Sequence, residues 1–207
     1  MALEKLGTEV RQEQLAQAAL DLIAAHGMKA LSIARVARHV GLVPSAIYRH
    51  FEGKDQLIEA VIGLMEDRLH KNIDHARTSA SDSLERLRLL LLAHISVIRE
   101  NRGILRIVFS DEVHKGHPEK KTRIYEMISG YLNRVTEIIA EGQGEGRIRS
   151  DVDAGTISVM FLGLIQPASI LWNMSDHKFD VTKHAERAWP VFRDAIAAEQ
   201  LARARCE

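Results

Sequence analysis

The stretch LSIARVARHVGLVPSAIYRHFEGK, residues 31–54, carries the signals for two short helices joined by a tight turn. Ser32 precedes the apolar residues of the first helix, and a serine hydroxyl in that position accepts a hydrogen bond from a free backbone amide. Gly41 ends this helix, because glycine adopts left-handed backbone angles at low cost. Pro44 suits the first position of the second helix, where its missing N–H needs no partner. We therefore expect a short helix on each side of Gly41.

The spacing of three residues in this stretch fits a helix-turn-helix. Gly41 follows Ala37 by four positions, and Ile47 follows Gly41 by six. Alanine lets two helices cross closely, glycine makes the turn, and a branched aliphatic side chain holds the second helix against the first. We expect the second helix to run from about Val43 to His50, with its polar side chains facing outward.

A local excess of positive charge accompanies this motif. The whole chain has 28 basic and 28 acidic residues, so its formal net charge is zero. Residues 28–54 contain five lysines or arginines and one acidic residue, Glu52, which leaves a local charge of +4, with two histidines in addition. A basic patch on a neutral protein is typical of a phosphate-binding surface. A solvated helix face is the alternative interpretation of the same charges.

These features together predict a DNA-binding head. A recognition helix enters the major groove with its first residues near base edges, while flanking residues bind phosphates. Small residues at the start of the second helix would approach the bases, and hydroxyl, imidazole, guanidinium and ammonium donors around them would bind the backbone. The predicted DNA-binding residues are Ser32, Arg35, Arg38, Pro44, Ser45, Ala46, Tyr48, Arg49, His50 and Lys54.

The composition predicts an all-α protein. Aromatic residues make up 5% of the chain and there are four prolines, whereas alanine, leucine, glutamate and arginine, which favour helices, are frequent. Apolar residues recur at helical spacing from Val10 to His26, from Lys54 to about Ala76, and in later segments that end near Ala202. A small head followed by a larger helical body is therefore expected.

Secreted and membrane-spanning proteins are not indicated. The single cysteine, Cys206, excludes an intramolecular disulfide and suits a reducing cytoplasm. The first residues lack the apolar segment of a secretory signal. The apolar run from Ile157 to Trp172 contains Gln166 and Pro167 and is shorter than the roughly 20 residues that span a bilayer. We expect a buried helix there and no membrane partner.

We expect no enzymatic, metal or cofactor site. His114 and His117 have the spacing of metal ligands, but Gly116 and Pro118 place them in a loop with no fixed further ligands, so a solvated loop is the preferred interpretation. The glycines between residues 142 and 146 follow a helix rather than a strand, which argues against a phosphate-binding loop. No nucleophile elbow, dinucleotide fingerprint or catalytic carboxylate pair is recognisable.

The segment GLVPSAIYRHFEGKDQL, residues 41–57, with LSIARVARHV before it, resembles the DNA-binding signature of the tetracycline repressor (TetR) family. The matching residues are Val36, Ala37, Gly41, Ile47, Tyr48, His50, Phe51, Lys54 and Leu57. The resemblance covers about residues 14–57. The chain departs from the family pattern at Val43, Ser45 and Ala46, which lie at the base-reading end, so the operator sequence does not follow from the resemblance.

The resemblance implies an all-α architecture of about nine helices, with three in a helix-turn-helix head and six in a regulatory body. It also implies a cytoplasmic homodimer and a repressor that a small-molecule effector releases from a double-stranded DNA operator. On these grounds, residues 1–53 are expected to be the DNA-binding domain and residues 54–207 the ligand-binding and dimerisation domain.

Candidate effector-binding residues are polar groups on otherwise apolar helices, with large apolar residues as pocket walls, because most ligand pockets combine the two. Each of them also suits an ordinary core or surface position. The candidates are Met65, His94, Arg106, Phe109, Tyr125, Met160, Gln166 and Trp172.

The apolar surface between residues 157 and 172 is wider than one helix face usually needs. It is either wholly buried within the body or partly in contact with a second copy, and we favour the second copy. The predicted dimer-interface residues are Ile157, Phe161, Leu164, Ile165, Ala168, Trp172, Trp189, Phe192 and Ile196.

Two other functions are weighed against this one. The first keeps DNA binding without an effector, as in an activator or a nucleoid-associated regulator. The second is an all-α enzyme that uses the body pocket, although the sequence shows no activated nucleophile.

Overall fold

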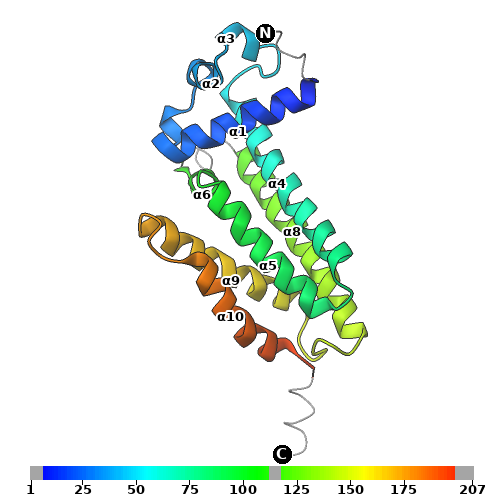
Figure 1. Ribbon diagram of the computed structural model, residues 1–207. Helices are drawn as coiled ribbons and strands as arrows, with labels where there is room; N and C mark the ends of the chain where they lie inside the picture. Colours follow the sequence, from blue (N-terminus) through cyan, green and yellow to red (C-terminus); the bar gives the residue numbers. More distant parts are fainter. Residues whose placement is uncertain (1–6, 112–117, 199–207) are drawn as a thin grey trace, which may run out of the picture. The chain divides into compact units, whose positions relative to one another are not determined.

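The computed structural model describes residues 7–111 and 118–198, and these are helical almost throughout (Figure 1). The described elements are α1 (Thr8–His26), the 3-10 helix η1 (Met28–Ala30), α2 (Ile33–His39), α3 (Pro44–Ile47), α4 (Lys54–Ser79), α5 (Ser83–Glu100), α6 (Ile104–Val108), α8 (Pro118–Gly144), α9 (Ala154–Met174) and α10 (Val181–Ile196). The prediction of an all-α chain is confirmed. His114 and His117 lie outside the described residues.

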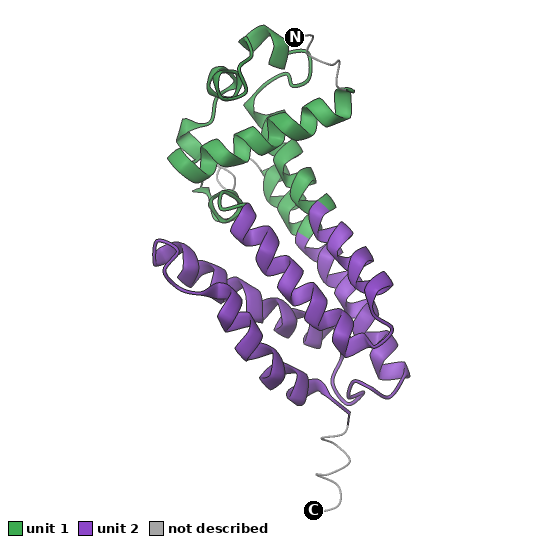
Figure 2. Cartoon of the chain, viewed as in Figure 1, with its two compact units in different colours: residues 1–67, 101–127 green, residues 68–100, 128–207 purple. Residues whose placement is uncertain are grey.

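Close packing divides the chain into two compact units (Figure 2). Unit 1 comprises residues 1–67 and 101–127, and unit 2 comprises residues 68–100 and 128–207. The boundary falls within α4 and within α8, so each of these helices contributes to both units. These compact units do not test the predicted functional division into residues 1–53 and 54–207, which stays a prediction.

Unit 1 contains more than the head that the sequence predicts. Gly103, which precedes α6, approaches α1 so closely that a β-carbon on it would lie 2.5 Å from the carbonyl oxygen of Leu20. The buried ammonium of Lys120, near the start of α8, lies 2.6 Å from a carboxylate oxygen of Asp55 on α4. The segments around α6 and the start of α8 therefore pack with the first helices of the chain.

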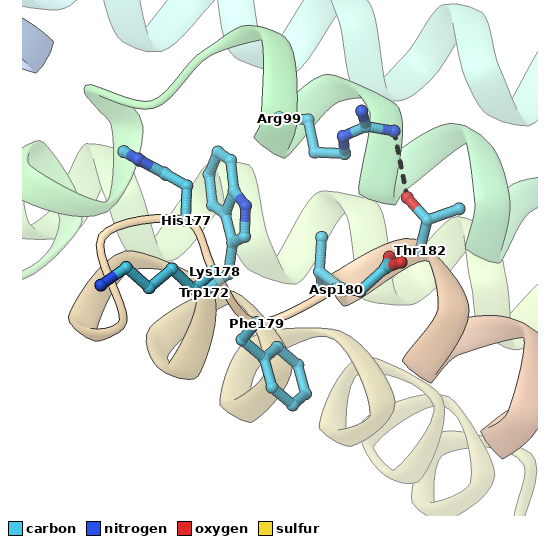
Figure 3. Close-up of a pocket in the computed structure, with 8 residues that line it drawn as sticks. Arg99, Trp172, His177, Lys178, Phe179, Asp180 and Thr182 are labelled. Atoms are coloured by element: carbon cyan, nitrogen blue, oxygen red, sulfur yellow. Dashed lines mark hydrogen bonds between the residues drawn. The ribbon is translucent and has the colours of Figure 1, made fainter.

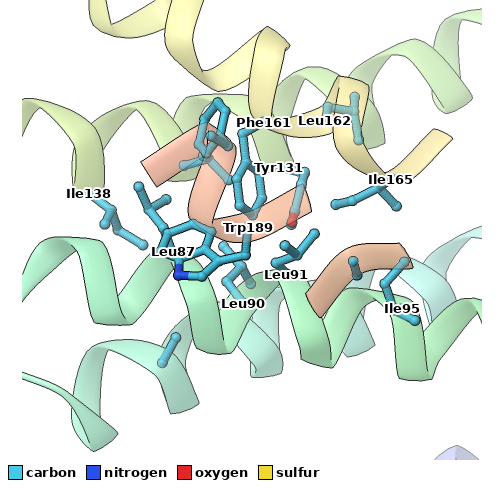
Figure 4. Packing of buried hydrophobic residues seen from close by; sticks show 14 of the residues in the cluster. Leu87, Leu90, Leu91, Ile95, Tyr131, Ile138, Phe161, Leu162, Ile165 and Trp189 are labelled. Atoms are coloured by element: carbon cyan, nitrogen blue, oxygen red, sulfur yellow. The ribbon is translucent and has the colours of Figure 1, made fainter. Parts of the chain in front are cut away.

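Unit 2 has a large apolar core (Figure 4). Leu87 and Leu91 of α5 pack there with Tyr131 of α8, Phe161 of α9 and Trp189 of α10. Burial of each large apolar side chain contributes on the order of 1.5–3 kcal/mol to folding. This core is therefore a large favourable contribution to the folding of unit 2.

Local sequence signals account for several helix ends. Gly27 follows α1 with a φ of 78°, and its N–H donates to the carbonyl oxygen of Ile23. The carboxylates of Asp153 and Asp180 cap α9 and α10, accepting backbone N–H groups at 2.8 and 2.9 Å. The last helix ends at Ile196 rather than near residue 202, because the chain there turns extended and pairs with the segment around Ile148.

Candidate nucleic-acid interface

The first helix of the motif, α2, begins and ends as its sequence predicts. Ser32 has extended backbone angles, and its hydroxyl oxygen accepts a hydrogen bond from the backbone N–H of Arg35 at 3.3 Å. Gly41 has a φ of 70°, a left-handed conformation that suits glycine. Val36 and Ala37 are completely buried, which leaves the other face of α2 in solvent.

The second helix of the motif is shorter than predicted. It spans only Pro44–Ile47 and is followed by turns up to residue 50, rather than continuing as a helix to His50. The N–H groups of His50 and Phe51 both bond to the carbonyl oxygen of Ile47, so the turns that follow α3 are closed by backbone hydrogen bonds. Ile47 itself is fully buried and anchors α3 in the core of the head.

Most of the predicted DNA-binding side chains lie on the outside of unit 1. Tyr48 is 57% exposed, and Ala46, His50 and Lys54 are partly buried. The remaining predicted residues, all exposed, are Ser32, Arg35, Arg38, Pro44, Ser45 and Arg49. The surface formed by residues 28–54 is called the basic surface below. Its contact with DNA stays a prediction.

The basic surface keeps its positive charge. Among the described residues, Lys29, Arg35, Arg38 and Arg49 have no carboxylate within ion-pair distance. The guanidinium of Arg35 donates to the carbonyl oxygen of Ala30 at 3.3 Å, which orients it without neutralising it. Unpaired cations on one surface attract the phosphates of a nucleic acid.

Two residues of this surface also hold the head together. The ammonium of Lys54 donates to the carbonyl oxygen of Met28 at 3.2 Å, and the side-chain amide of Gln12 donates to the carbonyl oxygen of His50 at 3.4 Å. The Nδ1 atom of His50 is buried and has no hydrogen-bond partner in the described part of the chain. Lys54 therefore has a structural role that the sequence did not reveal.

The predicted effector-binding residues are divided between the two units. Those in unit 1 are Met65, Arg106, Phe109 and Tyr125, and those in unit 2 are His94, Met160, Gln166 and Trp172. Met65 is almost fully buried, whereas Phe109 and Tyr125 are 59% and 70% exposed. Arg106 donates to the carbonyl oxygen of Ile23, which explains its place on α6 without a ligand. Their role in ligand binding stays a prediction.

His94 is part of a buried polar pair. Its Nδ1 atom lies 2.9 Å from the hydroxyl oxygen of Tyr131, within the apolar core of unit 2. Burial lowers the pKa of His94 to about 4 and raises the pKa of the Tyr131 hydroxyl. The sequence did not identify Tyr131 as the partner, because its position among the apolar residues of α8 is equally suited to an ordinary aromatic core residue.

Most of the predicted dimer-interface residues lie inside their own unit, and their part in a dimer stays a prediction. Eight of the nine are buried inside unit 2, with only Leu164 partly exposed. These eight are Ile157, Phe161, Ile165, Ala168, Trp172, Trp189, Phe192 and Ile196. Packing against their own chain leaves these side chains almost no surface for a partner.

Another face of α9 is apolar and exposed. Its residues Val159, Met160, Ile170, Leu171 and Met174 are between 39% and 78% exposed and recur at helical spacing. By length and composition, α9 is long and apolar enough to cross a membrane. Core helices of globular proteins often meet the same two criteria. These five residues are called the α9 stripe below.

Two family models match adjoining parts of the chain. The model described as bacterial regulatory proteins, tetR family, matches residues 15–61. The model described as YsiA-like protein, C-terminal region, matches residues 62–195.

Individual proteins similar to the chain are related to it over most of their length. The fatty acid metabolism regulator protein of Bacillus subtilis is 27% identical over 172 residues, which are 81% of this chain and 86% of that protein. The nucleoid occlusion factor SlmA of Vibrio vulnificus is 25% identical over 187 residues, 90% of this chain and 95% of the relative. The solved structure of the Bacillus subtilis transcriptional regulator FadR in complex with stearoyl-CoA has a TM-score of 0.72 and 24% identity, and the match covers 86% of this chain and 96% of FadR.

Proposed function

The chain belongs to the TetR family of bacterial regulatory proteins, and we propose that it is a cytoplasmic homodimeric repressor that a small-molecule effector releases from its DNA operator. In this proposal, residues 1–53 bind DNA, and residues 54–207 bind the effector and form the dimer. The observation that carries the proposal is the exposed turn of α3, which packs on the head through the buried Ile47. Near it in the sequence lie Lys29, Arg35, Arg38 and Arg49, which have no carboxylate at ion-pair distance within the described part of the chain.

The proposed docking places α3 in the major groove. Ser45 at its exposed end is small enough to let the backbone approach base edges, and Pro44 and Ala46 offer apolar contact to a thymine methyl group. Tyr48 and Arg49 follow directly and are exposed, so their hydroxyl and guanidinium groups are available to phosphates. Two copies of the head would read two half-sites about one helical turn of DNA apart.

Binding to selected DNA tests this docking. Duplexes bound by the protein are first selected from a random pool, and affinities are then measured by fluorescence anisotropy over a series of salt concentrations. We expect Tyr48→Ala to weaken binding roughly tenfold, and Arg49→Gln to reduce the slope of log K against log salt by about one. Arg187→Gln, an exposed charge on α10, is the control and should bind as the unaltered protein does. Equal affinity and slope in all four proteins would exclude the docking.

For the effector, we propose a long-chain acyl thioester of coenzyme A. The support comes from the similar Bacillus subtilis proteins, one described as a fatty acid metabolism regulator and one solved with stearoyl-CoA. An acyl chain needs apolar surroundings. Helices α5 and α9 of unit 2 supply apolar side chains, among them Leu91, Phe161 and Ile165. An effector acts only through its different affinities for the free and the DNA-bound states.

Displacement of the selected duplex tests the effector class. Stearoyl-CoA should release DNA at concentrations where coenzyme A alone and free stearate do not. Octanoyl-CoA is a matched probe of chain length and should act more weakly, because burial of each missing CH₂ is worth about 0.8 kcal/mol. Failure of every acyl thioester to release DNA would exclude this effector class while leaving DNA binding intact.

The proposed dimer forms through the α9 stripe. Exposed apolar residues at successive turns of one helix are costly in water, and a second copy related by a two-fold axis would cover them. Sedimentation should show a dimer for the unaltered protein and a monomer for Leu171→Glu. Lys71→Glu, at an exposed position on α4, should remain dimeric. A monomeric unaltered protein at micromolar concentration contradicts this part of the proposal.

A second candidate is a DNA-organising protein without an acyl effector. It is favoured by the similarity to the Vibrio vulnificus nucleoid occlusion factor, which extends over 90% of this chain. The displacement experiment separates the two, because only the repressor of the first proposal loses DNA when an acyl thioester binds.

A further inference from the structure

A pocket of about 420 Å³ opens at the turn between α9 and α10 (Figure 3). It is lined by Arg99 at the end of α5, by Trp172 near the end of α9, and by the continuous segment 177–182. All of these residues belong to unit 2. None of them except Trp172 was among the candidate ligand-binding residues, so the pocket is a separate feature of the molecule.

Hydrogen bonds hold the wall of this pocket in place. The N–H of His177 donates to the carbonyl oxygen of Trp172 at 2.8 Å, and the N–H of Phe179 donates to the hydroxyl of Ser175 at 2.8 Å. The rings of Trp172 and His177 meet edge to face, with centroids 4.4 Å apart. The turn is therefore preformed, which reduces the entropy lost when a ligand binds.

The guanidinium of Arg99 is fixed at the pocket. It donates to the hydroxyl oxygen of Thr182 at 3.1 Å, a contact between residues 83 positions apart in the chain (Figure 3). A guanidinium has five N–H donors in a planar fork, and most of them stay available after this single bond. Such a fork binds two oxygens of one carboxylate or phosphate group.

The charges at the pocket favour an anion. Within the described part of the chain, neither Arg99 nor Lys178 has a carboxylate at ion-pair distance. The carboxylate of Asp180 is already engaged as the cap of α10, accepting the N–H of Lys183. The lining thus has two cations against one carboxylate, which leaves a net positive charge.

The size and polarity of the pocket limit the anion further. A volume of about 420 Å³ is near the small end of the range for ligand pockets, about 300–1,000 Å³. Arg99, Lys178, Asp180 and Thr182 contribute charged or hydrogen-bonding side chains to its lining, so an acyl chain would gain little there. We propose that this pocket binds a small, water-soluble organic anion that carries carboxylate or phosphate groups. The inference does not depend on the repressor function.

Calorimetric titration of the full chain without DNA tests the proposal. The probes are citrate for carboxylates and glucose 6-phosphate for phosphates, at ionic strength held constant with chloride, and inorganic phosphate is titrated as the bare ion. We expect saturable binding of citrate or glucose 6-phosphate, and whichever binds identifies the class. Arg99→Gln should weaken it about tenfold or more, since a charge-assisted hydrogen bond is worth about 1.5–3 kcal/mol. Lys178→Gln should also weaken it, whereas Arg187→Gln, which removes an exposed charge on α10 outside the pocket lining, should not.

Fluorescence supplies an independent readout at the pocket. The chain has two tryptophans, so Trp189→Phe leaves Trp172 as the only indole. Binding should change its emission with the same midpoint as the calorimetric titration. The proposal is overturned when neither organic anion binds up to about 10 mM, well above the millimolar end of the affinity scale. It is equally overturned when inorganic phosphate binds as tightly as they do, or when both Arg99→Gln and Lys178→Gln, shown to be folded by circular dichroism, bind normally.

Discussion

His94 and Tyr131 are hydrogen-bonded to each other inside an apolar core, with Nδ1 2.9 Å from the hydroxyl oxygen and the rings edge to face at a centroid distance of 5.0 Å. The pair joins α5 to α8 in unit 2. A buried polar group is tolerated only when it has a partner, because an unsatisfied one keeps the full cost of its lost hydration. Each residue therefore supplies the hydrogen-bond partner that the other needs in the core.

The first prediction concerns the pH dependence of stability. Burial lowers the pKa of His94 to about 4, whereas an imidazole in the unfolded chain titrates near 6.5. The unfolded chain thus binds the proton more tightly, so the contribution of His94 is fully present above about pH 6.5 and is lost as the pH falls toward 4. The loss should be about 1.4 kcal/mol per pH unit within this window.

Urea unfolding at several pH values between 4 and 7.5 measures this effect. His94→Gln keeps a side chain that can bond to Tyr131 but does not titrate, so it should show a shallower loss of stability on acidification than the unaltered protein. His184→Gln, at an exposed position, should keep the steeper dependence. Parallel curves for all three proteins would contradict the assignment to His94.

The second prediction concerns the other member of the pair. Tyr131→Phe removes the hydroxyl and leaves Nδ1 of His94 without its partner, so the free energy of unfolding should fall by about 1–3 kcal/mol. Tyr48→Phe makes the same chemical change at a 57% exposed position and should alter stability by less than about 0.5 kcal/mol. Chemical unfolding at pH 7.5 compares the two variants. Equal losses of stability at both sites would contradict the stabilising role of the buried Tyr131 hydroxyl.

The third prediction uses two glycines in different surroundings. Gly103→Ala would place a β-carbon 2.5 Å from the backbone oxygen of Leu20, and since backbone cannot move aside as a side chain can, the protein should lose stability by about 1–3 kcal/mol. Gly63→Ala, inside α4 with nothing within 4 Å of the new atom, should raise stability by about 0.5–1 kcal/mol through helix propensity. Melting temperatures that shift in the same direction for both would be inconsistent with this packing.

The fourth prediction separates the two roles of Lys54. Lys54→Met keeps the length of the side chain and removes the ammonium that donates to Met28, so stability should fall by about 1 kcal/mol. If the ammonium also contacts a phosphate, the salt slope of DNA binding should fall by about one. Loss of stability with an unchanged slope would assign Lys54 a structural role alone.

The helix-turn-helix could be predicted from the sequence because its signals are local. The cap at Ser32, the turn at Gly41 and the buried position of Ile47 each depend on a few neighbouring residues. The end of α3 was not predicted because the turns that follow it are also closed by backbone hydrogen bonds, to the Ile47 carbonyl oxygen, and no proline or glycine marks residues 48–50.

The candidate sites in the body could not be predicted in the same way. Periodicity shows which residues of α9 avoid water, but it does not say whether they meet their own chain or a second copy, and Phe161 and Trp172 proved to meet their own. The partner of His94 lies 37 positions away, and the Arg99–Thr182 contact spans 83. Such pairings depend on how helices pack, which no short pattern encodes.

The α9 stripe also has a genetic consequence. It lies more than a hundred positions away from the basic surface, so a mutation can destroy one and leave the other intact. In the proposed dimer, a chain with defective residues 44–49 would still pair with a normal chain, and each mixed dimer would have only one head able to bind its half-site. Alleles that damage residues 44–49 should therefore be dominant over the normal allele in the same cell, whereas alleles that place a charge in the α9 stripe should be recessive.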